Sequence, residues 1–250
     1  MKTILVTGCS SGFGREIARY FLGRDWQVVA TMRTPRTDVL PASDHLRILP
    51  LDVTDPESVR KAVDAAGPID VLVNNAGIGA AAPFELTSTS LARELFETNT
   101  LGTMAVTQAV LPQFRERHAG VIVNITSTVT MMALPLLSMY TASKAAVNAF
   151  TESMALELAP LGIGVHLVLP GRAPETRFGD NAAEGGRAHG FDHEAYAELA
   201  QQFMAQLGST EDPVTYAKDV AQATWRAVHD AEAPMRIPAG EDAVALAEAS

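Results

Sequence analysis

Three polar residues near the middle of the chain have the types and spacing of an acid–base catalyst. Tyr140 and Lys144 lie four residues apart in a stretch with a helical pattern, so both side chains fall on one face, about 6 Å apart along the axis. The ordinary pKa of tyrosine is about 10, and a nearby ammonium group favours the phenolate. Ser127 follows a predicted buried strand and can direct its hydroxyl to the same point. We predict that these three groups converge.

A glycine-rich turn near the N-terminus is typical of a phosphate-binding loop. The stretch T-G-C-S-S-G-F-G lies between a predicted strand and an amphipathic helix. Its glycines, Gly8, Gly12 and Gly14, let the backbone turn sharply and approach a ligand, and the helix N-terminus offers free N–H groups to an anion. A strand, a glycine turn and a helix in this order favour the pyrophosphate of a dinucleotide. The alternative is an ordinary turn that happens to contain three glycines.

The end of the second predicted strand indicates which dinucleotide fits. An acidic residue at this place would hold the adenosine ribose of NAD, but no Asp or Glu occurs between Trp26 and Pro35, and the strand ends at Arg33. A guanidinium pairs with a phosphate through two parallel charge-assisted hydrogen bonds. Arg33, with Arg36 as a second candidate, therefore predicts the 2′-phosphate of NADP(H). A solvated loop arginine is the alternative.

Composition narrows the class of protein and of partner. A chain of 250 residues that is 47% hydrophobic and 19% charged suits one soluble domain with a large core. Its net charge of −10 argues against nucleic-acid or membrane binding, since both require a basic surface. Cys9 is the single cysteine, so a reducing cytoplasm is the expected location. The histidines show no metal-ligand spacing except the pair His189 and His193, and we predict no metal site.

Predicted strands and helices alternate along the chain, which indicates a parallel sheet covered on both faces. We predict an α/β fold, a doubly wound sheet of about seven strands with helices on both faces, in a single domain over residues 1–250. Residues 172–212 have too few apolar side chains for a core and are expected to form a substrate lid with a helix near 193–206. A long helix is expected over 90–114, and a tail over 238–250. The predicted strands are 3–7, 26–32, 45–51, 70–73, 121–126, 163–169 and 235–237.

Assembled in order, these motifs resemble the short-chain dehydrogenase/reductase family, in its shorter single-domain branch. The glycine motif, the acid Asp52, the sequence N-N-A-G after the fourth strand, and the thirteen-residue separation of Ser127 from Tyr140 all match. The resemblance implies a Rossmann-type fold and a catalytic set of Asn99, Ser127, Tyr140 and Lys144. It implies that a cofactor is bound by Gly8, Ser10, Ser11, Gly12, Phe13, Gly14, Arg33, Asp52, Val53, Asn75, Ala76, Gly77, Tyr140, Lys144, Pro170, Gly171 and Thr176.

The resemblance further implies an oxidoreductase that interconverts a carbonyl and a secondary alcohol by hydride transfer. NADP(H) is the preferred cofactor and NAD(H) is possible. Tyr140 would be the acid or base, Lys144 and the charge of the oxidised cofactor ring would lower the pKa of Tyr140, and Asn99 would hold a water. An NAD(H)-dependent alcohol dehydrogenase and a non-catalytic dinucleotide sensor are the alternatives. Members commonly pair through helices, so a homodimer or homotetramer is expected.

The segments expected to wall the substrate pocket favour an apolar molecule. Residues 78–84 and 128–139 contain no charged side chain, and burying a phosphate or carboxylate without a cation costs several kcal/mol. Methionines in the second segment suit a wall that adapts to more than one shape. The lid cations Arg172, Arg177 and Arg187 are the residues that could reverse this preference.

Overall fold

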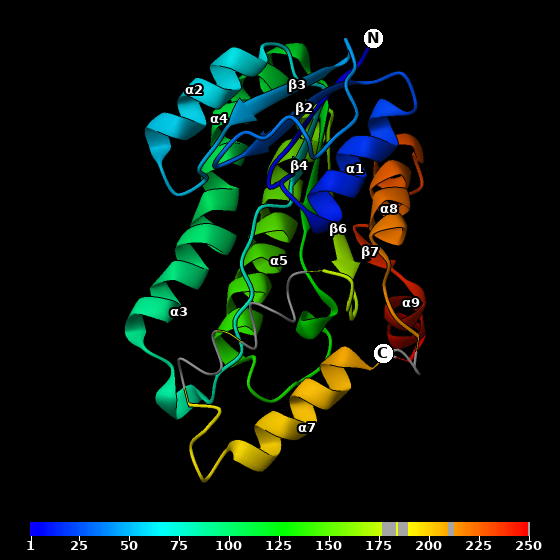
Figure 1. Cartoon of the computed structure of the whole chain (residues 1–250). Coiled ribbons are helices and arrows are strands. Elements are labelled where there is room, and N and C mark those ends of the chain that lie inside the picture. Colours follow the sequence, from blue (N-terminus) through cyan, green and yellow to red (C-terminus); the bar gives the residue numbers. More distant parts are fainter. Residues whose placement is uncertain (177–183, 185–189, 210–212, 250) are drawn as a thin grey trace.

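One parallel sheet of seven strands organises the chain. The computed structural model describes residues 1–176, 184, 190–209 and 213–249, and the strand order is β3-β2-β1-β4-β5-β6-β7 (Figure 1). The order reverses between β1 and β4, and the carboxyl ends of two such strands open a crevice suited to a ligand. The predicted sheet is confirmed. Its strands are β1 (Thr3–Val6), β2 (Gln27–Met32), β3 (Leu46–Pro50), β4 (Val71–Asn74), β5 (Gly120–Ile125), β6 (Ile163–Pro170) and β7 (Arg236–Ala239).

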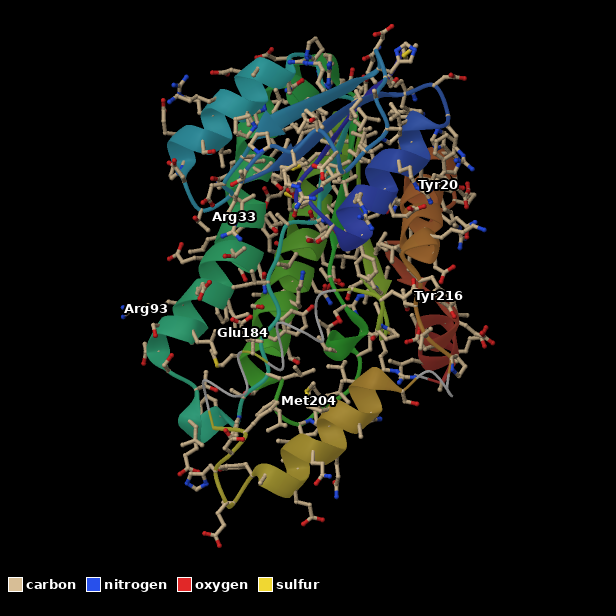
Figure 2. The ribbon with its side chains drawn as sticks, viewed as in Figure 1. Tyr20, Arg33, Arg93, Glu184, Met204 and Tyr216 are labelled. Carbon is tan, nitrogen blue, oxygen red and sulfur yellow. The ribbon has the colours of Figure 1, made fainter. Side chains whose placement is uncertain are left out.

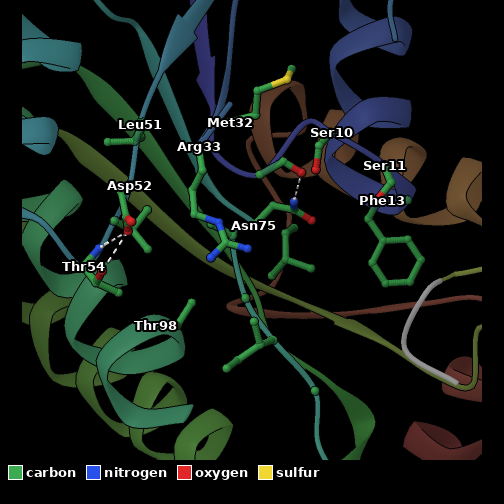
Figure 3. Close-up of a pocket in the computed structure, with 18 of the residues that line it drawn as sticks. Ser10, Ser11, Phe13, Met32, Arg33, Leu51, Asp52, Thr54, Asn75 and Thr98 are labelled. Carbon is green, nitrogen blue, oxygen red and sulfur yellow. Dashed lines mark hydrogen bonds between the residues drawn. The ribbon is translucent and has the colours of Figure 1, made fainter. Parts of the chain in front are cut away.

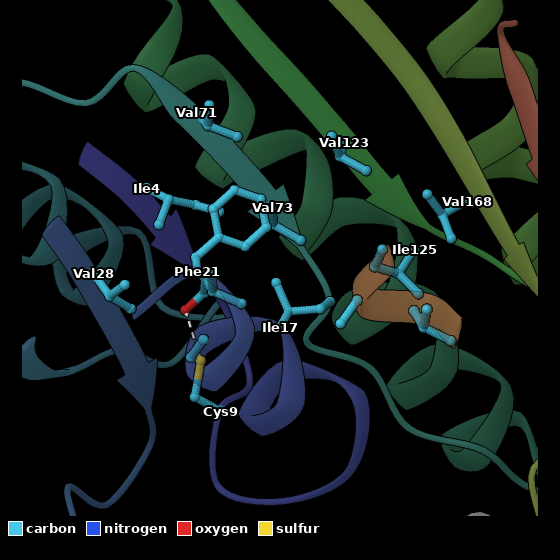
Figure 4. Packing of buried hydrophobic residues seen from close by; sticks show 14 of the residues in the cluster. Ile4, Cys9, Ile17, Phe21, Val28, Val71, Val73, Val123, Ile125 and Val168 are labelled. Atoms are coloured by element: carbon cyan, nitrogen blue, oxygen red, sulfur yellow. Dashed lines mark hydrogen bonds between the residues drawn. The ribbon is translucent and has the colours of Figure 1, made fainter. Parts of the chain in front are cut away.

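Helices cover both faces of the sheet (Figure 1). On one face α1 (Gly12–Leu22) packs beside α8 (Ala217–His229); the other face is covered by α2 (Pro56–Ala66), α4 (Gly102–Arg117) and α5 (Ser138–Leu158). Because successive residues of a strand point to opposite faces, Ile4 packs toward α1 while Leu5 packs toward α2 and α4. Figure 4 shows this first core, with Phe21 of α1 beside strand residues such as Ile4. Burial on both faces explains the nearly continuous apolar strands.

The helix expected over residues 90–114 consists of three pieces. It begins as α3 (Thr89–Phe96), widens into a π-turn, η2 (Glu97–Leu101), and continues as α4. Thr100 in the π-turn donates to the Ser143 carbonyl of α5 at 2.9 Å, and Asn99 also bonds α5. These bonds to a neighbouring helix favour the wider turn, and such π-turns often mark functional sites.

The expected tail over residues 238–250 is wrong, because β7 extends to Ala239 and a helix, α9 (Glu241–Glu248), follows it. Residues with good helix propensity form this helix, and its Asp242 carboxylate accepts from the Arg172 N–H at 2.6 Å and from the Thr215 hydroxyl at 2.7 Å. The helix expected near 193–206 is present as α7 (Ala197–Gly208). No helix among the described residues is both long and apolar enough to cross a membrane.

Candidate active site

A cavity of about 770 Å³ lies at the carboxyl ends of β1, β2, β4 and β5. The loop after β1, the ends of β2 and β3, the loop after β4, the π-turn and α5 all contribute to its wall (Figure 3). Of the predicted site residues, the wall contains Gly8, Ser10, Ser11, Gly12, Phe13, Arg33, Asp52, Val53, Asn75, Ala76, Gly77, Tyr140, Lys144 and Thr176. Parts of the chain up to 168 residues apart in sequence thus meet at the crevice that the sheet topology opens.

Hydrogen bonds join the glycine turn to the loop after β4. The Asn75 amide donates to the carbonyls of Thr7 and Gly8 at 2.9 and 3.2 Å, and the Thr7 hydroxyl accepts from the N–H groups of Asn75 and Ala76. Gly8 has φ of +74°, and a side chain there would crowd Ala76. Gly14 lies behind the wall, where a side chain would strike Asn75 and the Gly8 carbonyl. Gly14 therefore serves close packing, and the floor of the cavity is bare backbone.

The N-terminus of α1 opens into the cavity. Its cap residue, Ser11, makes no side-chain hydrogen bond to the first turn, and Ser10, Gly12 and Phe13 line the wall beside it. Uncapped N–H groups and the helix dipole favour an anion. A pyrophosphate therefore fits the donors present, as the glycine motif predicts.

Arg33 extends into the cavity between Asp52 and Thr54 on one side and Asn75 on the other (Figure 3). Within the described chain its guanidinium forms no ion pair, whereas Arg36 is paired with Asp38 at 3.3 Å and does not line the cavity. The N–H and hydroxyl of Thr54, and more weakly the charge of Arg33, hold the Asp52 pKa below its usual value. Arg33 is thus the guanidinium available to a phosphate in this part of the wall.

The four predicted catalytic residues are all buried near the inner end of the cavity. Tyr140 and Lys144 lie on α5, Ser127 precedes the short turn η3 (Thr128–Thr130), and Asn99 lies in the π-turn. The Lys144 ammonium donates to the Ile125 carbonyl at 3.0 Å, and the Ser127 oxygen accepts from Val129 N–H at 3.3 Å and hydrogen-bonds Tyr140. The predicted convergence of Ser127, Tyr140 and Lys144 is what the packing produces.

The Asn99 amide is fully engaged inside the protein. Its oxygen accepts from Ile78 N–H at 2.8 Å, and its nitrogen donates to the Ile78 carbonyl and to the Ser143 hydroxyl, each at 3.0 Å. Ser143 in turn donates to the Tyr140 carbonyl at 2.7 Å. Asn99 therefore ties the loop after β4 to the helix that carries Tyr140, which explains an asparagine at this position.

Burial shifts the pKa values of the two titratable residues of the site, Tyr140 and Lys144. It raises the pKa of Tyr140 to about 12, although the hydrogen bond with Ser127 acts in the opposite direction. It lowers the pKa of Lys144 to about 8. The expected lowering of the Tyr140 pKa is thus not found in the protein by itself, because loss of solvent around the phenolate outweighs the hydrogen bond with Ser127. At neutral pH Tyr140 holds its proton and is able to donate it.

Three predicted cofactor residues lie outside the cavity wall, namely Gly14, Pro170 and Gly171. Pro170 is buried at the end of β6, and the Gly171 N–H donates to the Thr215 hydroxyl at 2.8 Å. Thr176 does reach the wall, beside Gly12. Ile78 and Gly79, which belong to the predicted substrate wall, also line the cavity. The lining residues that the sequence did not predict are Met32, Leu51, Thr54, Glu94, Glu97, Thr98, Ile125 and Thr126. The helical spacing of Glu94, Glu97 and Thr98 was a usable signal.

The predicted substrate walls pack together against α7. Ala81 after β4 and Leu137 before α5 form one buried cluster with Phe191 and with Phe203 of α7. Phe84, at the end of the first wall, is instead 71% exposed. The side chain of Arg172 donates to the Gln206 and Ser209 carbonyls at the end of α7, each at 2.6 Å. Arg177, Arg187 and His189 lie outside the described residues.

Among the described residues, the thiol and the histidines form no metal-binding group with neighbouring acids. Cys9 is fully buried, its thiol donates to the Val6 carbonyl at 3.2 Å, and burial raises its pKa to about 12. In the part of the chain that the structure describes, no three His, Cys, Asp or Glu side chains are grouped to hold a metal ion. The polar chemistry of the described residues is therefore concentrated in the cavity.

Comparisons with known proteins agree with this geometry. Residues 2–185 match the family model described as short chain dehydrogenase. YusZ of Bacillus subtilis, an uncharacterized oxidoreductase, is 41% identical over 181 residues, which are 68% of this chain and 64% of that protein. The 3-ketodihydrosphingosine reductase of Bacteroides thetaiotaomicron is 39% identical over 184 residues, which are 72% of this chain and 66% of that protein. The chain thus spans just under two thirds of the length of these curated relatives.

Solved structures extend the similarity to nearly the whole chain. A short-chain dehydrogenase from Streptomyces avermitilis is 34% identical with a TM-score of 0.85, covering 99% of this chain and 91% of that one. A serine dehydrogenase complexed with NADP+ is 28% identical (TM-score 0.79, 96% and 95% covered). A 3-ketoacyl-(acyl-carrier-protein) reductase from Brucella melitensis complexed with NADH is 25% identical (TM-score 0.77, 95% and 96% covered). Similar proteins therefore bind either nucleotide.

Proposed function

This chain belongs to the short-chain dehydrogenase/reductase family, and we infer that it is an oxidoreductase that interconverts a carbonyl and a secondary alcohol with NADP(H). The observation that carries this proposal is that Tyr140, hydrogen-bonded to Ser127, and Lys144 line the same cavity as the N-terminus of α1. Such a site can hold a dinucleotide and a reacting carbonyl together. The relative named 3-ketodihydrosphingosine reductase supports a reaction in which a carbonyl group is reduced.

Different residues of the cavity are proposed to bind different parts of the cofactor. The N-terminus of α1 with Ser10 and Ser11 would bind the pyrophosphate, Asp52 and Val53 would contact the adenine side, and Lys144 would hold the nicotinamide ribose. When bound, the cofactor supplies or accepts the hydride, and the protein positions the reactants.

In reduction, negative charge develops on the carbonyl oxygen, and the site must stabilise it. Tyr140, protonated at neutral pH, donates its proton to that oxygen. Ser127 accepts from the Val129 N–H, which orients its hydroxyl so that its own proton can be directed at the same oxygen as a second donor. Before substrate arrives the two hydroxyls hydrogen-bond each other, so they lie side by side and one proton turns toward the carbonyl oxygen when it binds.

We further propose that the substrate is small and mainly apolar. The Ala81, Leu137 and Phe203 cluster supports this, and Arg172 is occupied by carbonyls of α7. Mixed with NADPH, a neutral ketone should be reduced with a higher kcat/KM than a ketone of equal size that carries a carboxylate beside the carbonyl. Oxidation of NADPH, followed at its absorbance band, measures both reactions. Binding without consumption of either ketone would indicate a dinucleotide sensor, and preference for the charged ketone would indicate a cationic pocket.

Cofactor preference is proposed to depend on Arg33. Replacing Arg33 with Ala removes a charge-assisted bond to the 2′-phosphate, so NADPH binding should weaken by about 1.5 to 3 kcal/mol, while NADH binding should stay nearly the same. Calorimetric titration of both nucleotides gives the two dissociation constants. Arg36→Ala is the matched control, because Arg36 is paired with Asp38 away from the cavity and should alter neither. An equal loss for both nucleotides would assign Arg33 to the fold.

The NAD(H)-dependent alternative has a specific observation in its favour. Asp52, Glu94 and Glu97 all line the cavity, and negative charge near the adenosine disfavours an added phosphate. The hydrogen bonds from Thr54 hold the Asp52 pKa low, so Asp52 keeps its negative charge and counts with the two glutamates. The Arg33 titration therefore decides between the two cofactors.

Assembly and location complete the proposal. Leu101 in the π-turn and Leu156 on α5 are 49% and 79% exposed, and apolar side chains on these two elements suit a homodimer or homotetramer built through helices. Residues 172–212 are proposed to act as the substrate lid of a single domain, and a cytoplasmic location suits a chain whose one cysteine is a free thiol.

A further inference from the structure

Three side chains on one face of α5 contact the short stretch that carries Ser127. Tyr140 hydrogen-bonds Ser127, Lys144 donates to the Ile125 carbonyl at 3.0 Å, and Asn148 donates to the Thr130 hydroxyl at 2.9 Å. Residues spaced by four lie above one another on a helix, so these contacts form three successive rungs. The first two belong to the proposed catalytic site, and the third has no role in it so far.

The Thr130 hydroxyl passes the third contact on to Ser127. It donates its proton to the Ser127 carbonyl at 2.8 Å, and so closes the turn η3. Since that proton is used, the same oxygen can only accept from Asn148, which assigns the amide nitrogen of Asn148 to this side. Asn148, Thr130 and Ser127 therefore form one directed chain of hydrogen bonds from the helix to the turn.

Packing alone does not explain an asparagine at this position. Asn148 is only 4% exposed, and its amide oxygen has no hydrogen-bond partner within residues 1–176, 190–209 and 213–249. Leaving a buried acceptor unpaired costs free energy, whereas a leucine of similar volume would leave no polar group unpaired. The amide is thus retained at a cost, and the Thr130 contact is its one observed benefit.

We propose that Asn148 is a positioning residue, which acts through Thr130 to hold Ser127 at a fixed place relative to Tyr140. The proposal rests on the proposed function, in which Ser127 and Tyr140 donate to one carbonyl oxygen. Those two donors come from different elements, a strand end and a helix, so their separation depends on contacts between the elements. A donor displaced from the position of the developing charge loses most of its effect.

Replacing Asn148 with Leu tests this role. We expect kcat to fall about tenfold and KM for both substrates to change little. The melting temperature should stay the same or rise. Thr130→Val removes the same chain from its other end and should have the same effect, so the test does not depend on one variant folding. The double variant should be no slower than either single one. Unchanged kcat in a folded Asn148→Leu or Thr130→Val protein would overturn the proposal.

A matched control separates positioning from general loss of packing. Thr151 lies one turn further along α5, is fully buried, and accepts from Asn124 instead of contacting the turn η3. Thr151→Val should therefore lower the melting temperature and leave kcat unchanged. A loss of kcat in Thr151→Val equal to that in Asn148→Leu would overturn the inference, because any buried polar residue of α5 would then have the effect.

A cycle with Ser127→Ala distinguishes this inference from the proposed function. Ser127→Ala alone should lower kcat roughly a hundredfold, and adding Asn148→Leu should then have little further effect. A full additional loss in the Ser127→Ala background would show that Asn148 acts on something else, and would overturn the inference alone. Unchanged turnover in Ser127→Ala would overturn the proposed role of Ser127 and the inference with it.

Discussion

Turnover of the Tyr140→Phe variant should fall at least about a hundredfold, because the change removes the proton donor and keeps the ring. The Tyr140 ring is packed in the buried cluster that includes Phe203 of α7, and phenylalanine preserves those contacts. Dissociation constants for NADPH should be nearly unchanged, since Lys144 and the glycine turn remain. Steady-state reduction of a neutral ketone, with nucleotide titration in parallel, measures both quantities.

Tyr20→Phe is a suitable control for loss of a tyrosine hydroxyl. Tyr20 lies on α1, against Trp225 and Arg24, away from Arg33 and the cavity (Figure 2). Its replacement should leave turnover unchanged. Retained activity in Tyr140→Phe would remove Tyr140 from the mechanism and leave Ser127 as the remaining donor.

The second large effect is expected for Lys144→Met, in opposite directions for activity and stability. Loss of the ammonium removes the group that would hold the nicotinamide ribose, so kcat/KM should fall at least about a hundredfold. Stability should rise at neutral pH, because burial disfavours the charged form of Lys144 and its one hydrogen bond within the described residues is to the Ile125 carbonyl. Sites shaped for function often carry such a cost.

The stability gained in Lys144→Met should decrease as the pH rises. Burial lowers the Lys144 pKa from its ordinary 10.5 to about 8, so between these values the unfolded chain binds more protons than the folded one. The free energy of unfolding of the wild-type protein therefore rises with pH between about 8 and 10.5. Below pH 8 the full destabilisation from burying the charged Lys144 is present. At 1.36 kcal/mol for each pKa unit the penalty is on the order of 3 kcal/mol, less the bond to Ile125.

Thermal unfolding of both proteins at pH 7 and pH 10.5 checks the sign. Lys144→Met should melt higher than the wild type at pH 7, and the difference should shrink at pH 10.5. Lys218→Met, on the exposed side of α8, is the control and should show no such trend. A difference that is the same at both pH values would mean that the gain comes from packing of the methionine.

Much of this site could be predicted from the sequence because the relevant constraints are local. Gly8 must be glycine where φ is +74°, and Tyr140 and Lys144 share a face because a helix repeats every 3.6 residues. Apolar runs that are buried on both faces predict parallel strands without knowledge of their partners. Spacing, chirality and hydrophobic period are properties of a short segment, so they can be read before folding.

Other features were decided only by contacts between distant segments. Asn99 bonds Ile78 and Ser143, which lie 21 and 44 residues away, and the π-turn follows from such bonds. Asp242 holds the Arg172 backbone across 70 residues, in a region that its own composition suggested was a tail. Hydrogen bonds between residues so far apart in the sequence depend on the three-dimensional arrangement of the strands.

The shift of the Tyr140 pKa likewise depends partly on the sequence and partly on the tertiary structure. The sequence by itself determined that a phenol, an ammonium and a hydroxyl meet at one site, because their types and spacing suffice for that. Only the tertiary structure decided that burial dominates, raising the Tyr140 pKa to about 12 and lowering that of Lys144 to about 8. Desolvation depends on how completely the surrounding elements exclude water, and that is a property of the packed protein.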